Sequence, residues 1–138
     1  LPERVSYDAE RNILFLNLEG WHARIKSDID DLRKVLVDAC KKAGQRVNSV
    51  VNHDGFRINE NLYDDYASMI QYLSANYYLT TTRYATSAFL RLKMEEALTK
   101  RGVAPHVFER KEEAQAFLGT TEDKKARKMI SPAVASAA

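Results

Sequence analysis

The chain has 138 residues, of which 45% are apolar and 29% charged, with a formal net charge of +2. This composition is that of an ordinary globular domain and excludes wholesale disorder, and the single cysteine excludes a disulfide scaffold. Much of the positive charge lies at 124–128, so we expect a basic tail and no nucleic-acid partner. No apolar run is long enough to span a bilayer, and we expect a cytoplasmic protein without a membrane partner.

The first part of the chain predicts two strands followed by a helix. The run 13–18 is almost continuously apolar, as in a strand covered on both faces, and a polar turn separates it from the alternating run 5–7. For the helix, Ser27 is the expected N-cap, with Asp30 completing a capping box, and Gly44 is the expected end. The apolar stripe of this helix comprises Ile29, Leu32, Leu36, Ala39 and Cys40.

The rest of the chain predicts alternating strands and helices. We expect a strand over 46–51, a helix capped by Asn59 or Asn61, a strand over 80–86, a helix capped by Ser87, a short strand over 105–108 and a helix over 111–118. The order ββαβαβαβα predicts an α/β fold with a small mixed, mostly parallel sheet and packed helices. We expect residues 1–119 to form one domain and residues 120–138 a charged, low-complexity tail.

Motifs for catalysis or metal binding are missing from the sequence. The histidines are far apart along the chain, and neither a phosphate-binding glycine loop nor a nucleophile elbow is present. Cys40 lies on the apolar stripe of its helix, which favours a buried core residue over a nucleophile. We therefore predict no catalytic residue and no metal ligand in this chain.

The best local cluster for ligand binding is the loop 52–57, which follows a predicted parallel strand. Ligands bind at the carboxyl ends of strands in open α/β sheets, so His53 and Asp54 are candidates, with Ser87 after the next strand. The alternative interpretation is structural: a turn with Gly55 at positive φ, an Asx-turn made by Asp54, and Ser87 as a helix cap. The structural interpretation is the more economical one for all three residues.

Four stretches resemble a known family. They are VSYDAERNILFLNLEG (5–20), VNHDGF (51–56), TRYATSAFLRLK (82–93) and APHVFE (104–109). Together they resemble the C-terminal extension of long bacterial acyl-CoA:acetate/3-ketoacid CoA-transferases, of the propionate CoA-transferase type. The order of strands and helices also resembles the STAS-like fold of anti-sigma-factor antagonists.

The resemblance implies a CoA-transferase polypeptide whose chemistry lies elsewhere. Such enzymes use a glutamate nucleophile in a Ser-Glu-Asn-Gly type context with a glycine-rich oxyanion loop. The nearest string here, around Glu60, lacks the flanking Ser and Gly. We therefore expect a non-catalytic domain that binds no cofactor of its own, with CoA handled by upstream catalytic domains of a homo-oligomeric enzyme. The start at Leu1, with the first methionine at Met69, agrees with an upstream part.

Two other functions are consistent with the same residues. The first is a stand-alone STAS-type module that binds a regulatory protein. Its phosphorylatable members carry a serine in an Asp-x-Ser context after the strand, whereas Gly55 and Phe56 follow Asp54 here. The second is a small-molecule-binding domain that uses the loop with His53 and Asp54 together with Ser87.

Overall fold

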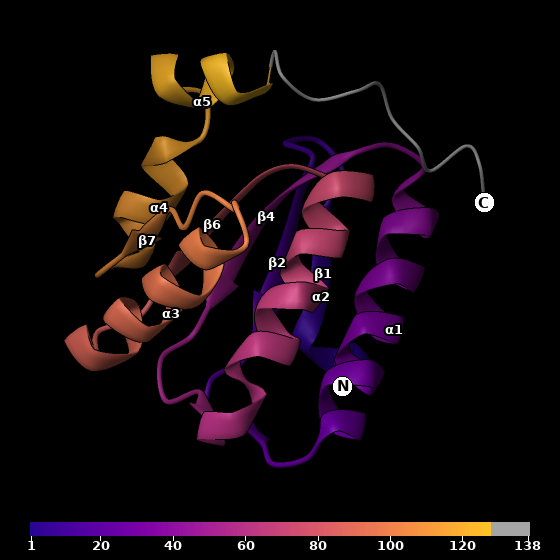
Figure 1. The fold of residues 1–138 in the computed structure, drawn as a ribbon. Coiled ribbons are helices and arrows are strands. Elements are labelled where there is room, and N and C mark those ends of the chain that lie inside the picture. The colour runs from indigo at the N-terminus through magenta and orange to yellow at the C-terminus, as the bar shows by residue number, and fades with distance from the viewer. Residues whose placement is uncertain (128–138) are drawn as a thin grey trace.

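A five-stranded sheet with the order β1-β2-β4-β6-β7 forms the centre of the molecule. In the computed structural model, which describes residues 1–127, four of these strands run parallel (Figure 1). The parallel strands are β2 (Ile13–Asn17), β4 (Val47–Asn52), β6 (Tyr78–Tyr84) and β7 (Val107–Phe108). The first strand, β1 (Val5–Asp8), pairs antiparallel with β2 through the polar turn. The predicted mixed, mostly parallel sheet is thus confirmed.

Helices cover both faces of this sheet. On one face, α1 (Lys26–Ala43), α2 (Tyr63–Asn76) and α3 (Ala88–Lys100) share a core with the strands. On the other face, α4 (Lys111–Phe117) packs against β4, β6 and β7. The structure adds a two-stranded parallel sheet of β3 (His22–Ala23) and β5 (Arg57–Ile58), and the short helices η1 (Pro2–Arg4), η2 (Glu60–Leu62) and α5 (Thr121–Arg127).

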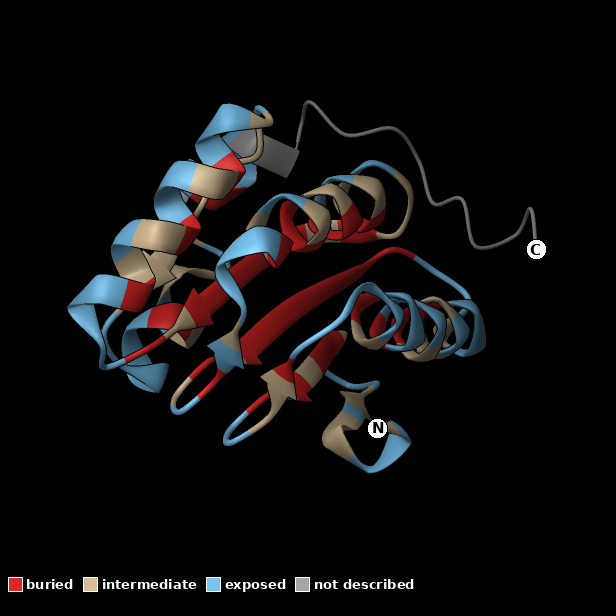
Figure 2. Ribbon diagram, turned by 60° about the horizontal axis from the view of Figure 1, so that its bottom comes forward, coloured by how far each residue is buried: buried red, intermediate tan, exposed pale blue. Residues whose placement is uncertain are grey.

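The alternation of side chains along β2 explains its continuous apolar run. Leu14 and Leu16 join the core under α1 and α2, while Ile13 and Phe15 pack toward α4 on the opposite face. Figure 2 shows the central strands buried along most of their length, with exposed residues on the outer sides of the helices. Cys40 is fully buried among apolar neighbours, and this burial raises the pKa of its thiol to about 12. It is the core residue that its place in the sequence predicts.

The start of α1 differs from the prediction. The helix begins at Lys26, one residue before the expected cap, and Ser27 lies inside it. The carboxylate of Asp28 accepts hydrogen bonds from the backbone N–H groups of Arg24 (2.8 Å) and Ile25 (3.2 Å). These bonds lower the pKa of Asp28 and hold the chain as it enters the helix. The expected end at Gly44 is confirmed, with φ of 74°.

The start of the expected tail forms a short helix, α5. Asp123 in this helix is fully buried, and its carboxylate accepts hydrogen bonds from the Thr80 hydroxyl and from the Gly119 backbone N–H. A carboxylate bound in this way joins the start of β6 to the turn after α4. The rest of the expected tail, from residue 128 onward, lies outside the described residues.

Candidate functional site

The loops after β4 and β6 meet at the carboxyl ends of their strands. The Oδ1 atom of Asp54 accepts hydrogen bonds from the backbone N–H of Thr86 (2.7 Å) and from its hydroxyl (3.2 Å). The backbone N–H of Asp54 itself donates to the side chain of Asn52 (2.8 Å), so Asn52 makes the Asx-turn that the sequence attributed to Asp54. Asp54 instead bridges two loops that are distant in the sequence.

A glycine permits the close packing at this edge of the sheet. Gly55 adopts φ of 68°, as its place in the turn predicts. A Cβ atom added there would lie 3.3 Å from the backbone nitrogen of Gly20 in the loop after β2. Three loops, after β2, β4 and β6, are thus in contact at the carboxyl edge.

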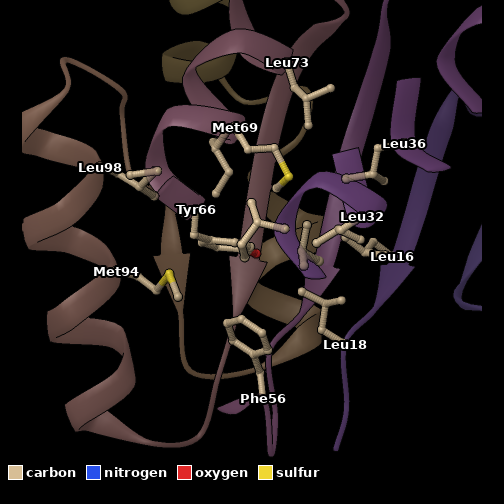
Figure 3. Packing of buried hydrophobic residues seen from close by; sticks show 14 of the residues in the cluster. Leu16, Leu18, Leu32, Leu36, Phe56, Tyr66, Met69, Leu73, Met94 and Leu98 are labelled. Atoms are coloured by element: carbon tan, nitrogen blue, oxygen red, sulfur yellow. The ribbon is translucent and has the colours of Figure 1, made fainter. Parts of the chain in front are cut away.

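His53 lies beneath these loops, in the core. Only 1% of the residue is exposed, and its Nε2 atom is 2.7 Å from the hydroxyl of Tyr66 in α2. Phe56 packs edge-on against the imidazole and lies next to Tyr66, as the lower part of Figure 3 shows for the two labelled rings. Burial and the positive charge of Arg83 lower the pKa of His53 to about 3, so the ring is neutral near pH 7.

Ser87 caps α3, as the structural interpretation predicts. Its hydroxyl accepts a hydrogen bond from the backbone N–H of Leu90 (3.2 Å). Ser87 directly follows Thr86, the partner of Asp54, so the fold brings two of the three candidate residues to one place and puts His53 below them. Each of the three uses its polar side chain inside the fold, and their role in ligand binding stays a prediction.

Asn59 holds the small β3–β5 sheet at the same edge. Its amide donates to the Arg24 carbonyl (2.9 Å) and its Oδ1 atom lies 3.0 Å from His22 Nε2. The sequence gives Asn59 or Asn61 as the cap of a helix. In the structure the chain first makes η2, and the side chain of Asn59 makes no hydrogen bond to that helix.

Glu60, the residue nearest to the family's glutamate motif, is a surface residue. Its side chain is 75% exposed and pairs with Lys93 at 3.0 Å. Within residues 1–127 no group of three or more His, Cys, Asp and Glu side chains is placed to hold a metal ion.

Large apolar side chains are exposed near the carboxyl edge. Phe89 is 64% exposed and Leu92 53% exposed, one turn apart in the first half of α3. Ile25, just before α1, is 61% exposed. The inner side of α3 is already packed in the core through Leu90 and Met94, so these outer residues are not needed for the domain's own packing.

Arg83 is buried in the core, which no motif in the sequence indicates. It pairs with Val51 across β4 and β6 and therefore points to the same buried side, where only 1% of it is exposed. One guanidinium nitrogen, Nη1, donates to the carbonyl of Pro105, while Nε is buried without a hydrogen-bond partner among residues 1–127. Burial lowers the pKa of Arg83 to about 10, and the group remains charged near neutral pH.

Arg83, the last residue but one of β6, is among the residues that line a cavity of about 580 Å³, together with Tyr78–Thr81 from the start of the same strand. A second hollow of about 660 Å³ lies on the opposite face, between the β1–β2 hairpin and α4. His53, Asp54 and Ser87 line neither of them. The strand alternation that buries Arg83 is present in the sequence, but only the register against β4 shows which face is inward.

Comparisons with known proteins identify no relative: no family model matches the chain, and no match was found among curated proteins or solved structures. In the part of the chain that the structure describes, none of the helices combines the length and the apolar character needed to cross a bilayer.

Proposed function

We propose that this chain is the non-catalytic C-terminal domain of a CoA-transferase, an enzyme that moves CoA between an acyl-CoA and a carboxylic or 3-keto acid. The proposal rests on the resemblance of four sequence segments to that family. The observation that supports it is where these segments lie. Residues 5–20, 51–56, 82–93 and 104–109 each cross the carboxyl end of a different strand, β2, β4, β6 and β7 in turn.

Backbone hydrogen bonds join these segments at the edge. Leu18 N–H donates to the carbonyl of Asn52 (2.9 Å), His53 N–H to that of Tyr84 (2.9 Å), and Ala85 N–H to that of Phe108 (3.0 Å). Segments spread over more than a hundred positions of the chain thus meet at one edge of the sheet. A resemblance concentrated at one edge agrees with a role in binding.

The exposed apolar residues indicate what kind of partner this edge binds. Phe89, Leu92 and Ile25 are large side chains at the same end of the fold, and apolar groups exposed together are typical of protein contacts. In the proposed enzyme this surface packs against the upstream catalytic domains of the same polypeptide, within a homo-oligomer. The domain then acts in assembly or in modulation of the active site, and CoA is bound by the upstream domains.

The first test examines the reading frame that encodes this chain and the activity of the purified chain. The proposal predicts that the reading frame containing this chain encodes CoA-transferase catalytic domains upstream of Leu1. It also predicts that the purified 138-residue chain transfers no CoA from acetyl-CoA to propionate. Turnover by the pure chain that Glu60→Ala abolishes would overturn the proposal.

The second test concerns the surface. In the complete polypeptide, Phe89→Ser with Leu92→Ser should weaken assembly in size-exclusion chromatography and reduce transferase activity. The matched control is Lys34→Ser with Asp38→Ser, two exposed positions one turn apart on α1. Equal behaviour of the two double variants would contradict the proposal. Capture of a sigma-factor regulator or its kinase by the wild-type chain would instead support the STAS-type alternative.

A further inference from the structure

The two edges of the five-stranded sheet differ in how they are protected. At one edge, β7 has only two residues and closely follows Pro105, and short strands and prolines are common means of blocking an edge. At the other edge, β1 has four residues, pairs with β2 without a bulge and contains neither proline nor lysine. Within residues 1–127 no strand lies along the outer side of β1, so this part of the chain leaves the edge open to a further strand.

The backbone of β1 indicates which residues face outward. The N–H of Val5 donates to the carbonyl of Pro2 in η1, so the backbone of Val5 is directed away from β2. Backbone groups alternate in direction along an antiparallel strand, so the N–H and carbonyl of Tyr7 are also directed outward, while Ser6 and Asp8 bond to β2. Tyr7 is therefore the centre of the open edge.

A hollow of about 370 Å³ lies along this edge, between β1 and α1. Figure 1 shows α1 on the β1 side of the sheet. Three α1 residues spaced four positions apart, Val35, Ala39 and Ala43, line the hollow opposite Val5 and Tyr7. All five are half-buried, so their side chains leave apolar surface at the edge that α1 and β1 do not cover by themselves.

The hollow on the other face of the sheet reaches the same strand, because Val5 and Ser6 line both hollows. Its charged lining consists of three basic residues and one acidic residue, namely Arg4, Arg11, Lys111 and Glu3. Arg11 pairs with Asp8 at 2.7 Å, whereas Arg4 and Lys111 form no ion pair within residues 1–127. One side of the edge is thus apolar and the other is positively charged.

We propose that β1 binds an extended peptide in which apolar and acidic residues alternate. The peptide adds as an antiparallel strand beside Tyr7, with its apolar side chains under α1 and its acidic side chains toward Arg4 and Lys111. Successive side chains of a strand point to opposite faces, so two different hollows at one edge select an alternating pattern. This site is separate from the proposed docking surface at Phe89 and Leu92 and does not depend on the proposed function.

The position of α1 favours a peptide over a second copy of this chain. Paired strands lie about 4.8 Å apart, whereas packed helices need about 8–10 Å between their axes. Because α1 packs on β1, pairing of two β1 strands would crowd the two α1 helices. A single added strand brings no helix with it.

Fluorescence polarisation with a labelled, end-capped peptide Val-Glu-Val-Glu-Val-Glu tests the proposal. Two control peptides keep part of its chemistry: Val-Lys-Val-Lys-Val-Lys reverses the charge, and Val-Val-Val-Glu-Glu-Glu keeps the composition without the alternation. We expect saturable binding of the alternating acidic peptide, with a dissociation constant at least about tenfold lower than that of either control.

Methylated peptides test the strand pairing itself. In the proposed ladder the valines lie opposite Val5 and Tyr7, on the α1 face, with their N–H groups directed at β1. Methylation of the valine nitrogens should therefore abolish binding. Methylation of the glutamate nitrogens, whose N–H groups point away from β1, should leave binding nearly unchanged.

A charge reversal in the protein tests the basic side. Lys111→Glu, at the exposed start of α4, should raise the dissociation constant of the acidic peptide by about three- to tenfold and improve binding of the lysine peptide. Lys100→Glu, which makes the same charge change at an exposed position on α3 outside both hollows, is the matched control and should change little.

Other results count against the proposal. Unsaturable binding, equal binding of the alternating and block peptides, or equal effects of the two sets of methyl groups would overturn it. Equal behaviour of Lys111→Glu and Lys100→Glu would contradict the assignment of an acidic peptide. A dimer in analytical ultracentrifugation that the peptide does not dissociate, together with no peptide binding, would assign the edge to a second copy instead.

Discussion

Two parts of the parallel sheet, the loops at its carboxyl edge and the interior of β6, differ in how their polar groups are satisfied. At the carboxyl end, Asp54 has two donors from Thr86, and backbone hydrogen bonds join the loops in series. Inside β6, Arg83 Nε and Thr81 Oγ1 lie buried without hydrogen-bond partners among the described residues. Polar side chains of the loops are thus satisfied by the fold, whereas two donors within a strand are not.

Removal of Phe56 should produce the largest effect and test how closed the carboxyl end is. The ring is 95% buried against Trp21, His53 and Tyr66, so Phe56→Ala should lower the free energy of unfolding by about 3–5 kcal/mol. Val103→Ala, at the half-buried edge of the cavity beside β6, should cost about 1 kcal/mol. Denaturation with urea measures both losses, and equal losses would show that the two regions are packed alike.

Acid should lower the free energy of unfolding through His53, which is buried under the loops at the carboxyl edge. Its pKa is about 3 in the folded chain against 6.5 when unperturbed, so the unfolded chain binds a proton that the folded chain does not. Stability from this residue is complete above about pH 6.5 and falls by about 1.4 kcal/mol per pH unit as the pH drops toward 3. His53→Gln keeps a polar group near Tyr66 without titrating, and its unfolding free energy should fall less steeply over this range. Parallel pH profiles would contradict the neutral buried ring.

Loss of the Asp54–Thr86 bridge between the loops after β4 and β6 should have a moderate effect on stability. Asp54→Ala removes both acceptor contacts to Thr86 and should cost about 1–2 kcal/mol, because hydrogen bonds to a charged group are stronger than neutral ones. Thr86→Val removes only the longer of the two and keeps the backbone N–H, so its loss should be clearly smaller. Thermal unfolding of both variants distinguishes a bridging carboxylate from an unattached one.

Loss of the Ser87 cap of α3 should have the smallest effect on stability. Ser87→Ala leaves the N–H of Leu90 without its acceptor and should cost about 1 kcal/mol. Ser87→Asp restores an acceptor and should recover most of the stability. A Ser87→Ala variant that matches the wild type in its melting temperature would show that the cap contributes nothing.

The sequence predicts the main strands well because burial imposes a clear pattern on them. The continuous apolar run in β2 indicates a strand covered on both faces, and the apolar stripe of α1 fits the period of a helix. Local capping is harder: Asp28 rather than Ser27 holds the start of α1, since both residue types can cap and only the backbone geometry decides. The helix α5 shows no apolar stripe, and it is held by the single buried carboxylate of Asp123.

Prediction of the candidate site from the sequence is limited in the same way. The positive φ of Gly55 and the cap by Ser87 follow from local preferences and are confirmed, whereas the Asx-turn expected of Asp54 is made by Asn52. The burial of His53 depends on Tyr66 and Phe56 from other elements. Arg83 is the clearest case, because a charged residue within a threonine-rich strand is expected on a solvent face. Only the pairing of β6 with β4 places it inward.

The most direct test of the account is hydrogen–deuterium exchange, comparing the isolated chain with the same residues in the complete polypeptide. We expect slower exchange in the complete polypeptide around Ile25, in the loop at 52–56 and in the first half of α3 near Phe89. The outer face of α1 should exchange equally in both. Unchanged exchange at the carboxyl edge, or protection confined to α1, would contradict a docking surface there.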